Sequence, residues 1–444
     1  MKIRSVRFRK LALVLSGLAL ATSGLSPRAS MGATRAFDDE RRAGTPYRHQ
    51  SNWEPTVATD PSNPDLVYQL ITGISARECE PRCPGTSVLF RKSEDGGATW
   101  GSQRFVCGLA CKGVGWQFDP QIKVATDGTI YVAFMNEYDP GVVLFTSSNR
   151  GTTWTGPTTM NDGLRYMDKP VLVISPTGRD VYVSFNGKYA TYVVASHDYG
   201  QTFLRPTRTN GIDHVWWYSD GGTIAPDGSV YFALNGETGK HLEGPVYISV
   251  LRCTPSARVS CANPTWTTLD TSAPAPPCHV FQCYQDYYAA TPSIASDTSG
   301  HLVAAYTFGA VDHGPKRLYT RTSDDGVTWS ARTLANSKGD SNVPQIAAGP
   351  GSGDFRLAWQ DDRTGAFNTW YSASSDGGST WGARVKLSNL TSGAPYKSKK
   401  GYTFTDGDYF GIAVSSAGVT FAIWGEADGS SLYCCGDVWY TKGS

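Results

Sequence analysis

Acidic residues stand at the start of several short, β-rich segments that each open with a proline or a glycine. They are Glu54 before Pro55, Asp119 before Pro120, Asp168 before Lys169-Pro170, and Asp408 just ahead of Phe410-Gly411. Glycoside hydrolysis needs one carboxyl group as acid and a second as base or nucleophile, about 5–9.5 Å apart across the bond. If these segments are equivalent parts of a repeated unit, their acids gather around one axis. We therefore predict that Glu54, Asp119, Asp168 and Asp408 are catalytic carboxylates.

Aromatic, amide and charged residues accompany these acids along the sequence. Aromatic rings stack on the C–H faces of pyranose sugars, while polar groups bind the sugar hydroxyls. The residues predicted to bind substrate are Trp53, Glu137, Lys169, Trp216, Trp217, Glu237, Tyr288 and Arg363. Together with the acids, they indicate an oligosaccharide or polysaccharide ligand.

The same set of residues is compatible with a second reaction. A lyase that cleaves uronate-containing glycans needs a base for the C5 proton and a cation that neutralises the carboxylate. His214 and Tyr218 are the candidate bases, and Lys169 or Arg363 is the candidate cation. In a third interpretation the protein binds glycans without cleaving them, and its acids could hold a structural Ca²⁺. None of the three requires a cofactor, and no catalytic metal site is predicted.

The elements that carry these residues follow from an eight-residue motif that occurs five times. Its copies are Ser93–Trp100 (SEDGGATW), Ser147–Trp154 (SSNRGTTW), Ser196–Phe203 (SHDYGQTF), Thr322–Trp329 (TSDDGVTW) and Ser374–Trp381 (SSDGGSTW). Glycine tolerates positive φ and an Asp side chain accepts bonds from turn amides, so the motif predicts a tight turn between two strands. The final aromatic residue is expected to pack between neighbouring sheets.

The spacing of the motifs predicts the architecture. The motif glycines are 54, 49 and 52 residues apart where copies are adjacent, and 126 residues separate Gly200 from Gly326. A period near fifty in a β-rich sequence is typical of the blades of a β-propeller. Seven segments have the pattern of an inner strand, from Glu54-Pro55 to Phe410-Gly411. We therefore predict an all-β, seven-bladed propeller, with six blades as the alternative.

The five motifs resemble the Asp-box, or BNR, repeats of the sialidase-like superfamily. The resemblance covers nearly all of residues 34–444 and implies a single propeller domain whose motif turns are scaffold. It assigns a structural role to four motif acids, Asp95, Asp198, Asp324 and Asp376, and places the function on the opposite face. Sialidases of this superfamily bind the substrate carboxylate with three arginines, the first in an Arg-Ile-Pro element. Here the corresponding element is Trp53-Glu54-Pro55, which lacks the arginine and does not favour sialidase activity.

The last repeat lacks one strand. It ends with a predicted third strand at Asp437–Thr441, and no room remains for a fourth. A segment within Ala36–His49 is expected to supply the missing outer strand, which would cover an exposed sheet edge. The charged run from Asp38 to Arg42 is a poor strand former, so this strand is expected to be weak.

The ten cysteines form five local pairs, which indicates disulfides and an oxidising compartment. Cys253 and Cys261 flank the one hairpin that lacks the motif, so a disulfide is predicted to replace the turn there. Cys278 and Cys283 are predicted to form disulfides as well. Cys434 and Cys435 are adjacent, and two alternatives stay open: a strained bridge between neighbours, or pairing of each sulfur elsewhere.

Residues 1–33 have the pattern of a signal peptide. A basic start precedes the apolar stretch Leu11–Leu20, and small residues follow it. The apolar stretch is too short for a membrane span, and no later one exists. Removing residues 1–33 takes away six of the 40 basic residues and none of the 39 acidic ones, which leaves a net charge of −5. We therefore expect a secreted monomer, extracellular or periplasmic, that does not bind nucleic acid.

Overall fold

The computed structural model describes most of the chain after the predicted signal peptide. The described residues are 37–39, 41–43, 51–74, 86–107, 116–209, 215–238, 244–274, 290–365, 367–388, 397–398, 401–402, 410–427 and 436–443. They form β-strands joined by turns, with no helix among them and therefore none that could cross a membrane. The predicted all-β class is confirmed.

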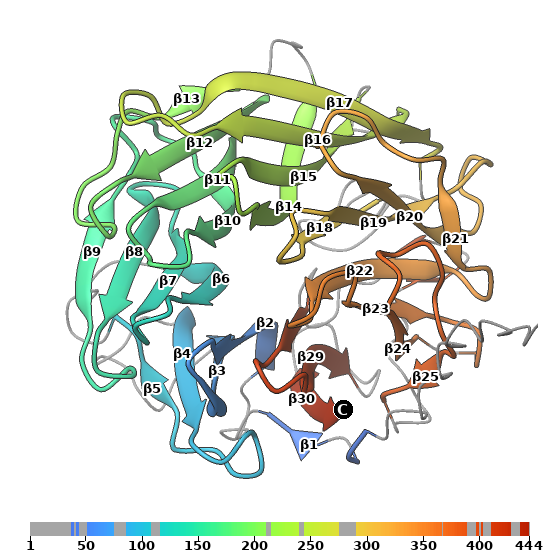
Figure 1. Cartoon of the computed structure of the whole chain (residues 1–444), viewed down its shortest axis with the longest axis horizontal. Coiled ribbons are helices and arrows are strands. Elements are labelled where there is room, and N and C mark those ends of the chain that lie inside the picture. Colours follow the sequence, from blue (N-terminus) through green and yellow to red (C-terminus); the bar gives the residue numbers. More distant parts are fainter. Residues whose placement is uncertain are drawn as a thin grey trace, which may run out of the picture. The chain divides into compact units, whose positions relative to one another are not determined.

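Seven four-stranded antiparallel sheets follow one another around a ring, as Figure 1 shows. Blade 1 consists of β2 (Ser51–Asp60), β3 (Asn63–Ile74), β4 (Thr86–Ser93) and β5 (Arg104–Phe105). Blade 2 consists of β6 (Gln117–Val124), β7 (Ile130–Asn136), β8 (Gly141–Ser147) and β9 (Thr155–Thr159). Blade 3 consists of β10 (Asp168–Ile174), β11 (Val181–Gly187), β12 (Ala190–Ser196) and β13 (Thr207–Arg208). Blade 4 consists of β14 (Trp216–Ile224), β15 (Val230–Glu237), β16 (Val246–Thr254) and β17 (Ala262–Ser272).

The remaining blades continue the pattern. Blade 5 consists of β18 (Ser293–Ser296), β19 (Leu302–Phe308), β20 (Arg317–Ser323) and β21 (Thr333–Asn336). Blade 6 consists of β22 (Ser341–Ala348), β23 (Phe355–Asp361), β24 (Asn368–Ser374) and β25 (Val385–Lys386). Blade 7 consists of β28 (Gly411–Val414), β29 (Thr420–Ala427), β30 (Gly436–Gly443) and, from the other end of the chain, β1 (Arg41–Arg42). A separate hairpin pairs β26 (Lys397–Ser398) with β27 (Gly401–Tyr402). The count of seven blades is confirmed.

The ring closes through the strand predicted before Trp53. In the antiparallel pair of β1 and β30, Arg41 lies opposite Tyr440 and Arg42 opposite Trp439. The backbone N–H of Ala43 donates to the carbonyl of Val438 at 2.6 Å. The strand has only two residues, as expected from its charged sequence. Even so, it joins the two ends of the chain in one sheet and covers the edge of β30.

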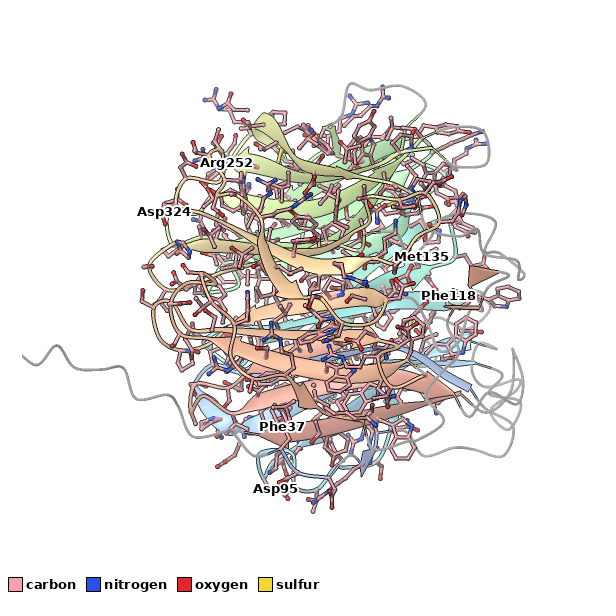
Figure 2. All side chains as sticks on the ribbon, turned by 90° about the vertical axis from the view of Figure 1, so that its right-hand side faces the viewer. Phe37, Asp95, Phe118, Met135, Arg252 and Asp324 are labelled. Carbon is pink, nitrogen blue, oxygen red and sulfur yellow. A yellow bond between two sulfur atoms is a disulfide. The ribbon has the colours of Figure 1, made fainter. Side chains whose placement is uncertain are left out.

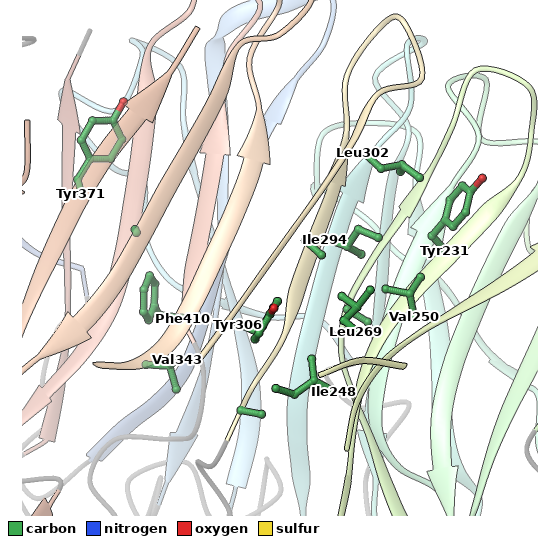
Figure 3. Close-up of a cluster of buried hydrophobic side chains, with 14 of the residues drawn as sticks. Tyr231, Ile248, Val250, Leu269, Ile294, Leu302, Tyr306, Val343, Tyr371 and Phe410 are labelled. Carbon is green, nitrogen blue, oxygen red and sulfur yellow. The ribbon is translucent and has the colours of Figure 1, made fainter. Parts of the chain in front are cut away.

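The hydrophobic core lies between blades. The clusters bridge neighbouring sheets, and one of them extends from blade 4 to blade 7, as Figure 3 shows. The second strand of a blade is buried on both faces, so it is apolar almost throughout rather than alternating. Every residue of β7 and of β11 is buried. Each blade therefore depends on its two neighbours to bury its apolar surface.

The motif turns join the third and fourth strands of their blades, as predicted. In blade 6 the Ser374 hydroxyl accepts a bond from the Gly378 N–H at 2.9 Å. The Asp376 carboxylate accepts bonds from the Thr380 N–H at 2.9 Å and the Thr380 hydroxyl at 2.6 Å. Burial alone would raise the pKa of Asp376, but these hydrogen bonds outweigh it and lower the pKa.

The motif glycines set how closely successive blades approach. Gly151 has a φ of 75°, a value that glycine adopts without strain. A Cβ at Gly151 would collide with the Phe90 ring of the preceding blade. The motif aromatic Trp154 packs edge-on against the same ring, with 5.2 Å between ring centroids. The motif turn of blade 2 therefore packs directly against blade 1. The predicted packing of the motif aromatic residue between neighbouring sheets is confirmed for Trp154.

One motif acid was assigned to the wrong residue. In blade 5 the carboxylate of Asp325, and not that of Asp324, accepts bonds from the N–H groups of Val327 and Thr328 at 2.8 and 2.7 Å. The reason is that Ser323 ends the strand, which makes this turn one residue shorter than the others. Asp324 has a 90% exposed side chain and binds His301 instead. Figure 2 shows Asp324 on the side of the propeller opposite Phe118 and Met135.

The predicted Cys253–Cys261 disulfide is present in the blade that lacks the motif. Cys253 lies opposite Val230, the first residue of the second strand, and the motif serines Ser147 and Ser196 hold the same position in their blades. The disulfide therefore occupies the place of the motif turn. Cys107 is also disulfide-bonded, and no described cysteine is free. Cys278, Cys283, Cys434 and Cys435 lie outside the described residues.

The two adjacent acids of blade 5 allow a matched test of the corrected assignment. Asp325→Ala should lower the free energy of unfolding by roughly 1–2 kcal/mol, because two turn amides lose their acceptor. Asp324→Ala removes only an exposed ion pair and should cost about 0–1 kcal/mol. Hydrogen bonds from Val327 and Thr328 lower the pKa of Asp325 to about 2. Its stabilising effect should therefore be complete above its unfolded-state pKa of about 4 and disappear as the pH falls toward 2. Urea unfolding of both variants from neutral to acidic pH checks this, and equal losses for both would contradict the assignment.

The disulfide of blade 4 should contribute measurably to stability. Replacing Cys253 and Cys261 together by alanine opens a short loop and should cost about 2–3 kcal/mol. Thermal unfolding of the double variant, beside the parent protein with and without reductant, measures this. A parent Tm unaffected by reductant, together with a double variant as stable as the parent, would show that the bond does not act as the turn does elsewhere.

Candidate functional site

The face opposite the motif turns, here called the upper face, carries the starts of the inner strands and the ends of the second strands. Five inner strands share one distortion there, in which the residue before a proline has a positive φ. These residues are Glu54 (51°), Asp119 (57°), Lys169 (48°), Thr291 (26°) and Val343 (39°). Proline normally keeps the preceding residue extended, so each of these positions is strained. In four of the blades the ladder is irregular at the same point, and a bulge of this kind re-aims a side chain.

Glu54 connects blade 1 to blade 2. Its side chain is buried, and its Oε2 accepts hydrogen bonds from the Thr72 hydroxyl at 3.2 Å and from the backbone N–H of Asp119 at 2.9 Å. One bond stays within blade 1 and the other crosses to blade 2. The carboxylate therefore holds two of the predicted catalytic residues, Glu54 and Asp119, next to each other.

Asp168, the first residue of β10 in blade 3, accepts hydrogen bonds from three other residues. Its Oδ2 accepts a bond from the Tyr166 hydroxyl at 3.3 Å and one from the Asn186 amide at 3.5 Å, and its Oδ1 accepts the Lys169 N–H at 3.0 Å. Burial, and after it the negative charge of Asp168, raises the pKa of Tyr166 far above its usual value. Tyr166 is therefore a neutral phenol at physiological pH and acts as a hydrogen-bond donor.

Aromatic rings from blades 2, 3 and 4 gather next to Asp168; Tyr138, Tyr166, Tyr189 and Trp216 are here called the aromatic cluster. Tyr138 stacks on Tyr166 with 4.7 Å between centroids, and Trp216 meets Tyr166 and Tyr189 edge-on at 5.9 and 5.2 Å. Tyr138 is 50% exposed and Tyr189 is 40% exposed. Burial, with Asp168 and Asp119 nearby, raises the pKa of Tyr138. The cluster thus contains two partly exposed tyrosines and lies close to two carboxylates.

Lys169 and Tyr218 meet beneath the cluster. The Lys169 ammonium lies 5.1 Å from the centroid of the Tyr218 ring, a cation–π distance. Both residues are at least nine-tenths buried, and Trp216 is tilted against Tyr218 with 6.1 Å between centroids. A cation predicted to neutralise a carboxylate and a predicted base therefore lie side by side at the junction of blades 3 and 4.

A cavity of about 100 Å³ lies on the propeller axis, lined by residues of all seven blades. Lys169 and Asp220 line it, and the Asn235 amide donates to Asp220 at 2.8 Å. Among the described residues, no group of three His, Cys, Asp or Glu side chains could hold a metal ion. A structural Ca²⁺ stays a prediction.

Several predicted substrate-binding residues lie elsewhere. Trp217 is 2% exposed and packs on Trp266 in the core, so its ring has no face open to a sugar. Glu237 is fully buried within blade 4. Arg363 binds the Asp361 carboxylate through Nε at 2.8 Å, and its guanidinium lies 3.9 Å from the Trp370 ring centroid. Its charge is therefore already paired inside blade 6.

The other predicted residues divide into two groups. Trp53 is half-buried in β2, and Glu137 is exposed just after β7. His214, Tyr288 and Asp408 lie outside the described residues, so their predicted roles stay untested.

Sequence analysis missed three members of the aromatic cluster, Tyr138, Tyr166 and Tyr189. A signal was present, because Tyr138 comes two residues after Asn136 and Tyr189 three residues after Asn186, and both asparagines lie within the last two residues of a second strand. Tyr166 stands two residues before Asp168. Predicted site residues such as Glu137 and Asp168 lie in or beside the same loops. Loops carry both merely exposed and functional aromatic residues, and no sequence period distinguishes the two kinds.

The sequence matches no protein-family model and no curated protein. Solved structures share the fold. A protein of unknown function from Dyadobacter fermentans is 13% identical, with a TM-score of 0.54 over 92% of this chain and 99% of that one. An ulvan lyase bound to -[GlcA(1-4)Rha3S]- is 11% identical, with a TM-score of 0.54 over 91% and 95%. A leech intramolecular trans-sialidase is 12% identical, with a TM-score of 0.47 over 93% and 70%. At such identities the likeness to the first two of these structures shows a shared fold, and no more.

The link through Glu54 can be tested by substitution. Glu54→Ala should lower the free energy of unfolding by about 1–3 kcal/mol, because the buried Asp119 N–H loses its acceptor. Glu54→Gln keeps an acceptor oxygen and should cost less. Glu137→Ala, in which an exposed acid is removed, is the control and should be neutral. Urea unfolding of the three variants measures these free energies. A Glu54→Ala protein as stable as the parent would refute the link between blades 1 and 2.

Proposed function

We propose that the protein is a secreted, carbohydrate-active propeller of the Asp-box type that cleaves an extracellular, uronate-containing polysaccharide by β-elimination. Residues 1–33 are its signal peptide, and residues 34–444 form the mature enzyme. The observation that carries the proposal is the contact between Lys169 and Tyr218 beneath exposed aromatic rings. The similar fold of a lyase bound to a glucuronate-containing oligosaccharide supports it.

The aromatic cluster supplies the binding surface. Tyr138 and Tyr189 expose ring faces on which pyranose rings can stack, and Asp168 is a hydrogen-bond acceptor at their side. A sugar held on these rings lies above the junction of blades 3 and 4. Its uronate carboxylate would then approach the Lys169 ammonium, which supplies the opposite charge.

The two tyrosines of the site have opposite electrostatic surroundings. A cation near a phenol favours its ionised form, and a carboxylate near a phenol favours its neutral form. Tyr166, whose pKa is raised by burial and by the charge of Asp168, suits an acid. Tyr218 lies against the Lys169 ammonium, which would balance the charge of a phenolate base.

The proposed reaction uses both residues. Lys169 neutralises the uronate carboxylate, which makes the C5 proton more acidic. Tyr218 as phenolate takes that proton, the C5–H electron pair forms the C4–C5 double bond, and the C4–O4 bond breaks. Tyr166 gives its proton to the leaving O4 oxygen. The products are an unsaturated uronate and a shortened chain, and no water is consumed.

Hydrolysis by two carboxylates is the second candidate. It is favoured by the surroundings of Tyr138, whose pKa is raised by burial and by the charges of both Asp168 and Asp119. Asp168 and Asp119, both predicted to be catalytic, therefore lie close enough to Tyr138 for their charges to act on the same ring. In that reaction one acid protonates the leaving oxygen and the other attacks the sugar or activates water. Cleavage of sialosides is not proposed, because the element Trp53-Glu54-Pro55 has no arginine before its proline.

The experiment is incubation of the mature protein with uronate-containing, sialylated and neutral glycans. β-Elimination produces new ultraviolet absorbance from the unsaturated uronate, whereas hydrolysis produces reducing ends without it. Lys169→Met and Tyr218→Phe should each lower the rate of cleavage by at least ~10²-fold, the usual effect of losing a group that transfers or stabilises charge. Tyr199→Phe, a change at an exposed tyrosine in a motif turn, is the matched control and should keep full activity.

The outcomes separate the interpretations. Reducing ends without ultraviolet absorbance, lost on Asp119→Asn or Asp168→Asn, would establish the hydrolase instead. Binding to glycans without any cleavage, weakened by Tyr138→Ala or Trp216→Ala, would identify a binding protein. Cleavage that survives in Lys169→Met and Tyr218→Phe would rule out the proposed site.

A further inference from the structure

The axial cavity contains a lysine that the proposed reaction does not use. Lys123, in β6, lines the cavity, and no hydrogen bond or ion pair involves it within the described part of the chain. Its side chain is half-buried, and this burial lowers the pKa of its ammonium. It lies four residues beyond Asp119 along β6, roughly 13 Å at about 3.3 Å per residue. Lys123 is therefore well below the upper face.

Other polar groups of the cavity also lack partners. The Thr291 hydroxyl is buried, since the residue is 3% exposed, and it makes no hydrogen bond. Gln121 and Gln345 line the cavity, and neither side chain forms a hydrogen bond among the described residues. Hydroxyl and amide groups can all donate to an acceptor in the cavity. The groups without partners thus include one cation and several donors.

Other polar groups of the lining already have hydrogen-bond partners within the protein. Ser219 bonds to Ser184 at 2.6 Å, and Ser293 accepts the Ile346 N–H at 3.2 Å. The one acid of the described lining, Asp220, accepts the Asn235 amide, and Lys169 adds a second positive charge. Two lysines thus face one aspartate, so the lining carries a net positive charge.

The ammonium of Lys123 is half-buried and has no protein partner among the described residues, so water, an anion or loss of its proton must compensate its charge. An anion in the cavity would compensate the charge of Lys123 and could also accept hydrogen bonds from hydroxyl and amide donors of the lining. A cavity of about 100 Å³ has room for a small ion and some water but not for a sugar. We infer that the axial cavity is a binding site for a small inorganic monoanion, held at Lys123.

Chloride is the probe. The Tm of the mature protein is measured while chloride replaces gluconate at constant ionic strength and pH, because gluconate is too large for the cavity. The parent protein should show a saturable rise on the order of a few degrees, as expected for a ligand that binds only the folded state. Lys123→Gln should abolish the rise. Lys386→Gln, the same change at an exposed lysine of β25, should retain it.

A second measurement does not depend on the folding of a variant. Crystals of the parent protein grown with bromide should show anomalous scattering from bromide within the cavity. A Tm that does not respond to chloride, a response that survives in Lys123→Gln, or bromide bound only at the surface would each overturn the inference. None of these results depends on whether the upper face cleaves a glycan.

Discussion

Contact between neighbouring blades is the interaction on which the rest of this structure depends. The second strands are apolar on both faces, so a blade on its own would expose two hydrophobic surfaces. The motif turns keep the contact close, since Gly151 allows its turn to reach Phe90 of the previous blade and Trp154 packs there as well. The ring must also close, and two arginines of β1 complete the last sheet.

The arrangement of the blades in a ring determines which residues meet on the upper face. Inner strands from all blades begin near one axis, so residues far apart in sequence become neighbours. Glu54 reaches the backbone of Asp119 across 65 positions, and Trp216 meets Tyr166 and Tyr189 across the next junction. The scaffold acts on chemistry only by placing these groups, so the fold alone does not determine a reaction.

The fold could be predicted from the sequence because its signals are repeated and local. A motif that occurs five times fixes turns, and a regular spacing fixes blades. Errors arose where the pattern allowed two solutions. Thr322-Ser323-Asp324-Asp325 contains two possible serine and acid pairs, and only strand register shows that Ser323 and Asp325 form the turn. Trp216 and Trp217 are adjacent on one strand, so one of them must face inward. The pairing of Arg363 with Asp361 depends on packing that sequence spacing does not reveal.

The distorted residues before the inner-strand prolines give this nearly symmetric ring a direction. The same backbone conformation holds a glutamate in blade 1, an aspartate in blade 2, a lysine in blade 3, a threonine in blade 5 and a valine in blade 6. At these five equivalent positions the charge therefore changes from negative in blades 1 and 2 to positive in blade 3 and neutral in blades 5 and 6, although the main chain hardly changes. A linear polymer lying across such a surface is not equivalent to the same polymer reversed. The repeated bulge thus keeps the same backbone in each blade while the charge of one side chain differs from blade to blade. A single substitution at this position would change the distribution of charge around the ring.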